Sequence, residues 1–389
     1  MDKTERIYLD YAAATPLDNE VLQSMLPYFS ECFGNANSQH YYGRKAAEAL
    51  DAAREAIAAA IGARDSEIYF TSGGTEADNL AVFGAARAQK KRGRTQIIIS
   101  AAEHHAVTES AETLAKDEGF ELTVIPINGD GRIDLDFLRN NVTKNTALVA
   151  VMAANNELGT IQPVNAAAEI AHAAGATFFT DAVQAAPYLQ LNVTELGADM
   201  LSFSAHKFYG PKGAGILYVK SGLPIRRLIA GGEQERGLRG GTVNVAAAVG
   251  AAAAYKKTVA EMEENNQKLY ALKQRFLKEI SAYPFIKING GDGENSLPSI
   301  VNLRIDGAVN DAVLSLMDLR GVAASAGAAC VGGDVMPGKT LLAAGLSEEQ
   351  AKSSFRVSFG KQNTEDQIVR AAKIIGEIGK TLTQYGAER

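Results

Sequence analysis

Short apolar runs alternate with stretches of helical periodicity from residue 67 onward. Several of these runs are almost continuous in apolar side chains, which is typical of strands covered on both faces. They lie at residues 68–71, 96–100, 122–127, 147–152, 177–180, 200–204 and 215–219. Helical patterns lie between them, at residues 76–91, 108–118 and 164–174. The alternation predicts an α/β fold in which helices cover both faces of an open, mostly parallel sheet.

Two longer helical patterns frame this unit. Residues 44–61 are rich in alanine with Glu and Arg at helical spacing, and residues 243–280 begin rich in alanine and become strongly charged. The pattern then changes to short strands among short helices. The strands are expected at residues 286–288, 299–303 and 356–359.

This change in pattern predicts two domains. We place the boundary inside the long helical pattern, so that a large domain covers residues 13–260. A smaller α+β domain covers residues 1–12 and 261–389, with the first dozen residues packing against the C-terminal part.

Composition narrows the class of protein. The 389 residues carry a formal charge of −6 and are 46% hydrophobic, which is ordinary for a globular protein with a sizeable core. The acidic balance argues against nucleic acid or a membrane surface as a direct partner. Two cysteines, Cys32 and Cys330, are too few for a disulfide scaffold, and the first ten residues lack the apolar run of a signal peptide. We therefore expect a cytoplasmic protein.

Polar residues that follow the predicted strands are the candidates for chemistry, because ligands collect at the carboxyl ends of strands in open α/β sheets. Ser72-Gly73-Gly74-Thr75-Glu76 follows the first run and opens a helix, so it either holds a phosphate on free N–H groups or is an ordinary turn with a threonine cap. Glu103-His104-His105 follows the second run. These histidines suit stacking or acid–base work better than a metal, since no cysteine or carboxylate cluster at ligand spacing accompanies them; a capping or surface pair is the alternative.

The later strand ends carry further polar groups. Asn155-Asn156 would bind a ring substituent or a carboxylate, or form a turn. Asp181 ends its strand where a carboxylate should face a cation or a protonated ring nitrogen, unless it caps a helix. Lys207 follows another strand beside Ser204 and His206, where partial burial would lower the amine pKa and allow a Schiff base with an aldehyde. Taken alone, Lys207 would more simply be a solvated surface lysine.

The combination is more specific than any of its parts. A phosphate turn, a stacking histidine, a ring-facing aspartate and a Schiff-base lysine follow one another at successive strand ends. Together they indicate pyridoxal 5′-phosphate (PLP) as the cofactor, whose ring acts as an electron sink while a carboxylate keeps its nitrogen protonated.

At these residues the chain resembles fold-type I PLP-dependent transferases of the class V aminotransferase group, and within it the cysteine desulfurases of the NifS/IscS kind. The resemblance covers nearly the whole length. Its segments are Ile7-Tyr8-Leu9-Asp10-Tyr11-Ala12, Gly34-Asn35-Ala36-Asn37-Ser38, Thr71-Ser72-Gly73-Gly74-Thr75-Glu76, Glu103-His104-His105-Ala106-Val107, Asn155-Asn156-Glu157-Leu158-Gly159, Asp181-Ala182-Val183-Gln184, Ser204-Ala205-His206-Lys207, Arg239-Gly240-Gly241-Thr242 and Arg356-Val357-Ser358-Phe359-Gly360.

The resemblance implies a role for each matching residue. Lys207 would form the Schiff base, Asp181 would pair with the pyridine nitrogen, Gln184 would bind the ring hydroxyl, and His104 would stack on the ring and transfer protons. The phosphate would be held by Gly74, Thr75, Ser204 and His206, and by Thr242 from the second subunit of a homodimer. Asn156 and Arg356 would bind the substrate carboxylate, with Asn35 assisting. No metal is implied.

The resemblance also assigns the reaction. Cys330, in the small-residue stretch 324–334, would attack the sulfur of PLP-bound L-cysteine and leave L-alanine and an enzyme persulfide. Ala326 and Ala328 stand where relatives commonly carry serine, and the chain is expected to lack the longer C-terminal tail with which housekeeping members dock an iron–sulfur scaffold. Cys32 is expected to be a packing thiol.

The sulfur would supply iron–sulfur cluster assembly or tRNA thiolation, through an acceptor that is a scaffold protein or a tRNA-thiolation enzyme. Three alternatives stay open: a selenocysteine lyase, an aminotransferase of the same fold and a catalytically inactive sulfur-transfer scaffold. Cys330 argues against the aminotransferase, which needs no thiol, and the intact Lys207, Asp181 and His104 argue against the inactive scaffold.

Overall fold

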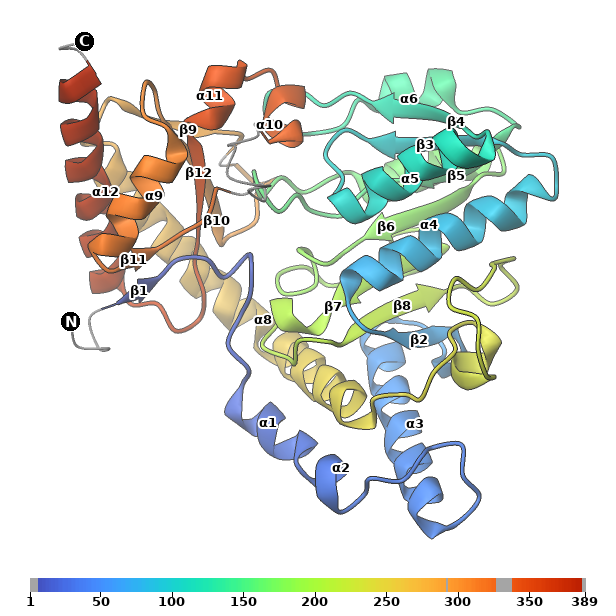
Figure 1. The fold of residues 1–389 in the computed structure, drawn as a ribbon. Helices are drawn as coiled ribbons and strands as arrows, with labels where there is room; N and C mark the ends of the chain where they lie inside the picture. The colour runs from blue at the N-terminus through green and yellow to red at the C-terminus, as the bar shows by residue number, and fades with distance from the viewer. Residues whose placement is uncertain (1–5, 292, 327–337, 387–389) are drawn as a thin grey trace.

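A computed structural model describes residues 6–291, 293–326 and 338–386 (Figure 1). In this part of the chain seven strands form the central sheet, in the order β2-β8-β7-β6-β5-β3-β4. Only β8 runs antiparallel to its neighbours there, so the predicted mostly parallel sheet is confirmed. The strands are β2 (Ile68–Thr71), β3 (Gln96–Ser100), β4 (Glu121–Ile125), β5 (Thr146–Ala150), β6 (Thr177–Asp181), β7 (Met200–Ser204) and β8 (Gly215–Val219).

Two strands end earlier than their apolar patterns suggest. The apolar pattern covers residues 122–127, but β4 ends at Ile125 because Pro126 has no N–H to donate to a neighbouring strand. The pattern at 147–152 continues past the end of β5, where the Met152 N–H turns to the Glu103 carboxyl at 2.7 Å. The apolar run therefore marks the buried stretch rather than the hydrogen-bonded ladder.

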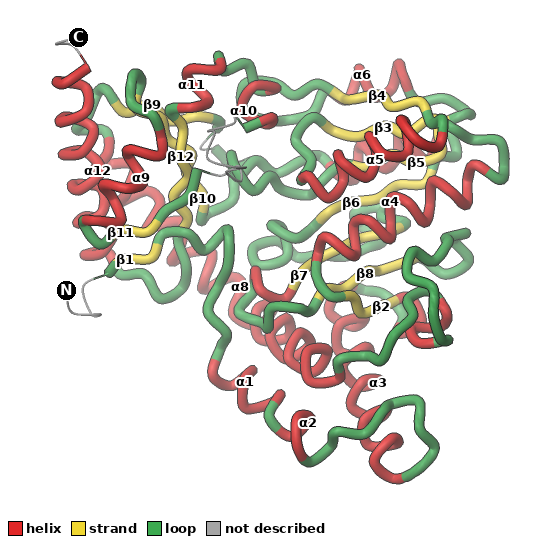
Figure 2. Tube along the Cα trace, in the orientation of Figure 1, coloured by secondary structure: helices red, strands yellow, loops and turns green. Residues whose placement is uncertain are grey.

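Helices cover both faces of the sheet (Figure 2). Ile97 and Ile99 of β3 pack into an apolar cluster with α4 (Gly74–Lys90) and α5 (His105–Glu118), whereas Ile98 belongs to the cluster on the other face. That second face is covered by α3 (Tyr41–Ile61), α6 (Leu135–Asn141), α7 (Val164–Ala173) and the first half of α8 (Val245–Ile280). Alternate strand residues thus serve opposite layers, as expected of a strand buried on both faces.

The longest helix joins the two halves of the molecule. The Asn244 side chain accepts a hydrogen bond from the Ala247 N–H and so caps the start of α8. The 36 residues of α8 extend about 54 Å, from beside the large sheet to the C-terminal part (Figure 1). The domain division at residue 260 stays a prediction, and α8 continues through that position without a break.

The C-terminal part contains a second, antiparallel sheet in the order β12-β10-β9. The N-terminal β1 (Ile7–Tyr8) joins this part by pairing in parallel with β11 (Val322–Ala323). The remaining elements are α1 (Asn19–Met25), α2 (Pro27–Ser30), β9 (Ile286–Asn289), β10 (Ile300–Ile305), α9 (Asn310–Leu319), α10 (Lys339–Ala343), α11 (Glu348–Lys352), β12 (Ser354–Ser358) and α12 (Glu365–Gly386). None of the helices in the described ranges is long and apolar enough to cross a membrane.

Candidate active site

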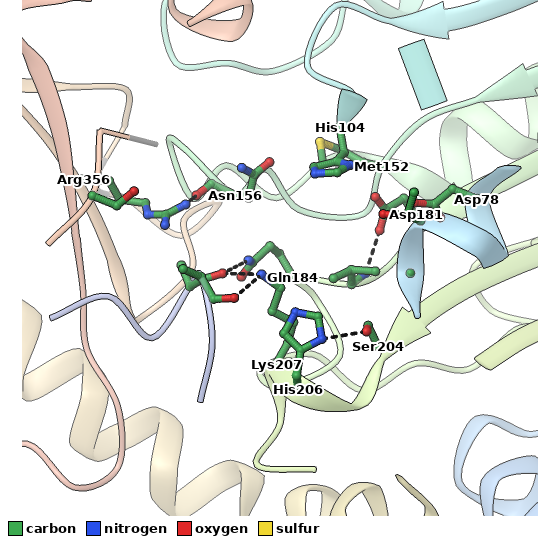
Figure 3. A pocket seen from close by; sticks show the side chains of 16 residues that line it. Asp78, His104, Met152, Asn156, Asp181, Gln184, Ser204, His206, Lys207 and Arg356 are labelled. Carbon is green, nitrogen blue, oxygen red and sulfur yellow. Dashed lines mark hydrogen bonds between the residues drawn. The ribbon is translucent and has the colours of Figure 1, made fainter. Parts of the chain in front are cut away.

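A cavity of about 350 Å³ lies where the ends of the central strands meet the C-terminal part (Figure 3). It gathers most of the residues that the sequence singled out. Those that line it are Gly74, Thr75, His104, Asn156, Asp181, Gln184, Ser204, His206, Lys207 and Arg356. Ala12, Ala13, Asp78, Met152, Val183 and Ser325 complete the lining.

Lys207 lies in a 3-10 turn (Ala205–Lys207) directly after β7. Its Nζ donates to the carbonyl oxygens of Ala12 at 2.6 Å and Ala13 at 2.9 Å. Burial, and next the charge of Arg356, lower the pKa of the Lys207 amine to about 8. A primary amine that is partly neutral near physiological pH is the form that attacks an aldehyde.

Asp181 is the buried last residue of β6, and its Oδ1 accepts from the Val183 N–H at 2.8 Å. Burial raises the pKa of Asp181, while the charges of His104 and Lys207 oppose the rise. Asp78, from α4, lies beside it (Figure 3). The Asp78 side chain accepts a hydrogen bond from the Ser202 hydroxyl. Burial and the charge of Asp181 raise the pKa of Asp78 well above its usual range, which favours the neutral form of Asp78.

His104 lies where α5 begins, and its ring caps that helix. The Nδ1 atom accepts from the Ala106 N–H at 3.1 Å, so the neutral ring carries its proton on Nε2. Burial lowers the pKa of His104, which favours this neutral form.

Gly74 and Thr75 begin α4 and form one end of the cavity together with Ser204 and His206. A Cβ at Gly74 would lie only 2.9 Å from the Val183 side chain. Glycine is therefore the residue that lets the backbone approach Val183 this closely. Ser204 Oγ and His206 Nδ1 are 2.9 Å apart, and burial lowers the pKa of His206 to about 4, which keeps this ring neutral. The first N–H groups of a 17-residue helix together with hydroxyl groups are suited to a phosphate.

Arg356, on β12, forms the opposite end and is only 3% exposed. One guanidinium nitrogen donates to the Asn156 carbonyl at 2.7 Å and another to Asp10 Oδ1 at 2.9 Å. Its buried Nε has no hydrogen-bond partner among the described residues. Two hydrogen bonds therefore fix the guanidinium of Arg356 at the cavity, and a guanidinium is suited to binding a carboxylate.

Two residues expected at the site, Asn35 and Thr242, do not line this cavity. Asn35 is exposed in the loop before α3, where its side chain accepts from the Asn37 N–H at 3.0 Å. Thr242 lines a separate cavity of about 190 Å³ that Ser72 and Arg239 also line. Cys330 lies outside the described residues. Cys32 is a half-buried free thiol.

The sequence did not single out Asp78 or Asp10 as parts of the site. Asp78 lies one turn after the Gly74-Thr75 pair on α4, but nothing in its spacing shows that it is buried. Asp10 reaches Arg356 only because the N-terminal segment pairs with the C-terminal part. Among the described residues no group of three His, Cys, Asp or Glu side chains is arranged to hold a metal ion.

Comparison with known proteins gives the family. Residues 7–370 match the model of the aminotransferase class-V family. The chain belongs to this family. It is 42% identical to the cysteine desulfurase IscS of Clostridium botulinum strain Hall, over 97% of this chain and 95% of the relative. It is 44% identical to the putative cysteine desulfurase IscS 1 of Bacillus subtilis strain 168, over 97% and 100%.

Similar folds are found among solved structures. A NifS-like protein superposes with a TM-score of 0.90 at 35% identity, over 97% of this chain and 100% of the other. A structure of SspA in complex with cysteine superposes with a TM-score of 0.81 at 35% identity, over 92% and 99%. The predicted fold class, the recognition of the NifS/IscS kind, cysteine desulfurase activity and PLP as the cofactor are thereby confirmed.

The residues present fit this cofactor. The cavity joins an anion cradle, a buried carboxyl, a neutral histidine ring and a lysine with a lowered pKa, which are the groups that a phosphorylated pyridine aldehyde requires.

Proposed function

We propose that this class-V enzyme removes sulfur from L-cysteine, releases L-alanine and carries the sulfur as a persulfide on Cys330. The observation that carries the proposal is one cavity with a phosphate cradle at one end and the Arg356 guanidinium at the other, with Lys207 between them (Figure 3). An amino acid bound by its carboxylate at Arg356 would present its amino group toward the cofactor.

Each cofactor contact follows from the chemistry of the residue. Gly74, Thr75, Ser204 and His206 would hold the phosphate, Asp181 would keep the pyridine nitrogen protonated, and Gln184 would donate to the ring hydroxyl. Lys207 would attach covalently to the aldehyde carbon. When bound, PLP supplies an electron sink for the bonds at the substrate α-carbon.

The remaining residues would act on the substrate. The Arg356 guanidinium and the Asn156 side chain would bind its carboxylate, and Asn35 is proposed to assist. The neutral His104 ring would accept and return a proton at the substrate carbons on its face of the cavity. As the substrate C–S bond breaks, an S–S bond forms at the Cys330 thiolate, and the carbon that loses sulfur takes up a proton.

The approach of Cys330 is supported by the chain that precedes it. Ser325 lines the cavity, and its N–H and C=O pair with the backbone of Arg356. Cys330 follows five residues later in the sequence, and an extended chain covers up to about 3.5 Å per residue. A chain of this length would allow the thiol to reach a substrate held at Arg356.

A homodimer is part of the proposal. Thr242 and Asn35 lie outside the cavity of their own chain, and exposed aromatic side chains surround the Asn35 loop: Phe29, Phe33, Tyr41 and Tyr42. A second copy that covers these rings would bring Thr242 to the phosphate of the other subunit. Beyond the dimer, a cytoplasmic location and a sulfur-acceptor protein, either an iron–sulfur scaffold or a tRNA-thiolation enzyme, are proposed. Nucleic acid and membrane are not proposed as direct partners.

The test is the Cys330→Ser variant, with Cys32→Ser as its matched control. Cys330→Ser is expected to keep the cofactor absorbance and the spectral change on adding L-cysteine, but to form neither persulfide nor alanine in a single turnover. Cys32→Ser is expected to behave as the wild type. Alanine and sulfide release by Cys330→Ser at the wild-type rate would exclude Cys330 as the acceptor.

A further inference from the structure

A second cavity of about 320 Å³ adjoins the active site behind His104. It lies between the end of β3, the start of α5, the edge strand β4 and the start of α10. His104 and Asn156 line both cavities, so these two side chains form a shared wall.

Glu103 lines this second cavity and is 93% buried, since only 7% of the residue is exposed. One carboxyl oxygen, Oε1, accepts from the Ser100 hydroxyl at 2.5 Å and from the Met152 N–H at 2.7 Å. The other, Oε2, has no partner among the described residues. Burial, and the charge of Asp181, raise the pKa of Glu103 to about 8.

Glu157 lines the same cavity, is 8% exposed and also has a buried Oε2 without a partner in the described part of the chain. Burial raises the pKa of Glu157, while the charge of Arg356, the Thr340 hydroxyl and the charge of His105 oppose the rise. No ion pair between described residues includes Glu103 or Glu157. The lysine at the rim, Lys339, instead approaches Glu109 and Glu112, at 3.7 Å and 3.6 Å.

Two buried carboxyl groups line this cavity, and each has an oxygen without a partner among the described residues, which is costly for a buried polar atom. A positively charged donor would pair with these oxygens and favour the ionised carboxylates. An occupant of this cavity would lie next to the catalytic cavity, behind His104 and Asn156, and the second reactant of a desulfurase is the thiol that accepts the sulfur.

We propose that the second cavity binds a small thiol that carries an ammonium group, with the ammonium on the Glu103 and Glu157 carboxyls, as an acceptor of the enzyme's sulfur. This proposal rests on the persulfide proposed above. The acceptor thiolate attacks the terminal sulfur of the persulfide, a new S–S bond forms on the acceptor, and the bond to Cys330 breaks. Cys330 leaves as a thiolate, so electrons balance without an added oxidant or reductant.

The experiment compares two thiols as acceptors during multiple turnovers with L-cysteine. 2-(Dimethylamino)ethanethiol carries a tertiary ammonium, which cannot condense with PLP, and 2-mercaptoethanol is the neutral counterpart. Each is used with the wild type, with the Glu103→Gln/Glu157→Gln double variant and with Glu121→Gln, which alters an exposed carboxylate on β4. Glutamine keeps the acceptor oxygen that Ser100 and Met152 use, so the double variant retains these hydrogen bonds.

The measured quantity is the ratio of wild-type to variant kcat/KM for each thiol. Because both values in a ratio are measured with the same thiol, differences in acidity between the two thiols do not affect it. Loss of a charge-assisted contact predicts a ratio of about ten or more for the ammonium thiol and close to one for 2-mercaptoethanol. Glu121→Gln is expected to give ratios near one for both.

Equal ratios for the two thiols would overturn the proposal and leave the cavity as a water site. The first-turnover burst of alanine is measured in the same samples. If the wild type gives no burst, the persulfide mechanism itself fails, whereas an intact burst with equal ratios rejects only the acceptor site.

Discussion

Lys207 supplies the amine to which the cofactor is expected to attach, and its surroundings explain why this amine is reactive. The amine is buried beside the guanidinium of Arg356, and both effects favour its neutral form. Lys207→Ala is expected to purify without the visible absorbance of the attached cofactor and without desulfurase activity, because no other group replaces the amine. Lys212→Ala, which removes an exposed lysine from the following loop, is the matched control. Turnover in Lys207→Ala would refute the assignment.

The lowered pKa of Lys207 has a measurable consequence in the cofactor-free protein. Only the neutral amine attaches to the aldehyde, so the rate of cofactor attachment should rise with pH and level off above about 8, instead of near the ordinary lysine value of about 10.4. Stopped-flow absorbance across pH 6–10 measures this rate, with a free lysine derivative in the same buffers as a reference. Arg356→Met removes a neighbouring positive charge and should move the midpoint upward. A rate that still climbs at pH 10 in the wild type would contradict a buried, partly neutral amine.

At the scale of elements, the free edge of strand β2 forms hydrogen bonds with side chains instead of with another strand. Glu235 accepts from the Phe70 N–H at 2.8 Å and forms a buried two-bond ion pair with Arg54, at 2.8 Å and 2.9 Å. Glu235 and the next residue, Arg236, adopt left-handed conformations with φ of 46° and 55°. The segment that leads to Thr242 is thus held in a strained form by an ion pair.

Breaking this pair should cost more than breaking a surface pair. Glu235→Gln leaves the Arg54 charge buried without a counter-charge, which is expected to lower the free energy of unfolding by about 3–5 kcal/mol. Chemical denaturation at one fixed protein concentration measures this, with Asp136→Asn as a control that breaks an exposed pair and changes stability by less than about 0.5 kcal/mol. The double variant Arg54→Met/Glu235→Gln should recover part of the loss. Equal effects of Glu235→Gln and Asp136→Asn would show that the pair does not anchor the segment.

At the scale of the whole molecule, the position of Thr242 makes a prediction about subunit assembly. Hybrid dimers of Lys207→Ala and Thr242→Val subunits contain one complete site if Thr242 serves the other subunit, since the lysine of one chain then meets the threonine of its partner. The hybrid should therefore bind PLP with wild-type affinity at one of its two sites. Homodimers of Thr242→Val should bind it about tenfold to a hundredfold more weakly, because a bond to a charged phosphate is lost.

Titration of separated hybrid dimers with PLP, followed by absorbance, checks this prediction. If Thr242 instead serves its own subunit, no hybrid site combines Lys207 with an intact threonine contact, and every binding site of the hybrid is weak. A fully active monomer at high dilution would exclude the dimer altogether.

The sequence by itself determined the layers of the fold and the residues at strand ends. Runs of apolar side chains marked all seven strands of the large sheet, and burial on both faces leaves little choice of residue in the inner strands, though not in the edge strand β4. The chemical types of Lys207, Asp181 and His104, in their order along the chain, indicated the cofactor before any geometry was known.

Only the tertiary structure decided which residues share an environment. Asp78 and Glu103 became buried acids through the packing of α4 and the ends of β3 and β5, and burial depends on neighbours far away in the sequence. Asp10 meets Arg356, 346 residues away, only because β1 joins the C-terminal part. The tertiary structure also left Asn35 and Thr242 outside the cavity of their own chain. The local sequence pattern determines where helices and strands form and which polar residues are candidates for the site. Burial and contacts between distant parts of the chain determine the charge of these residues and their partners.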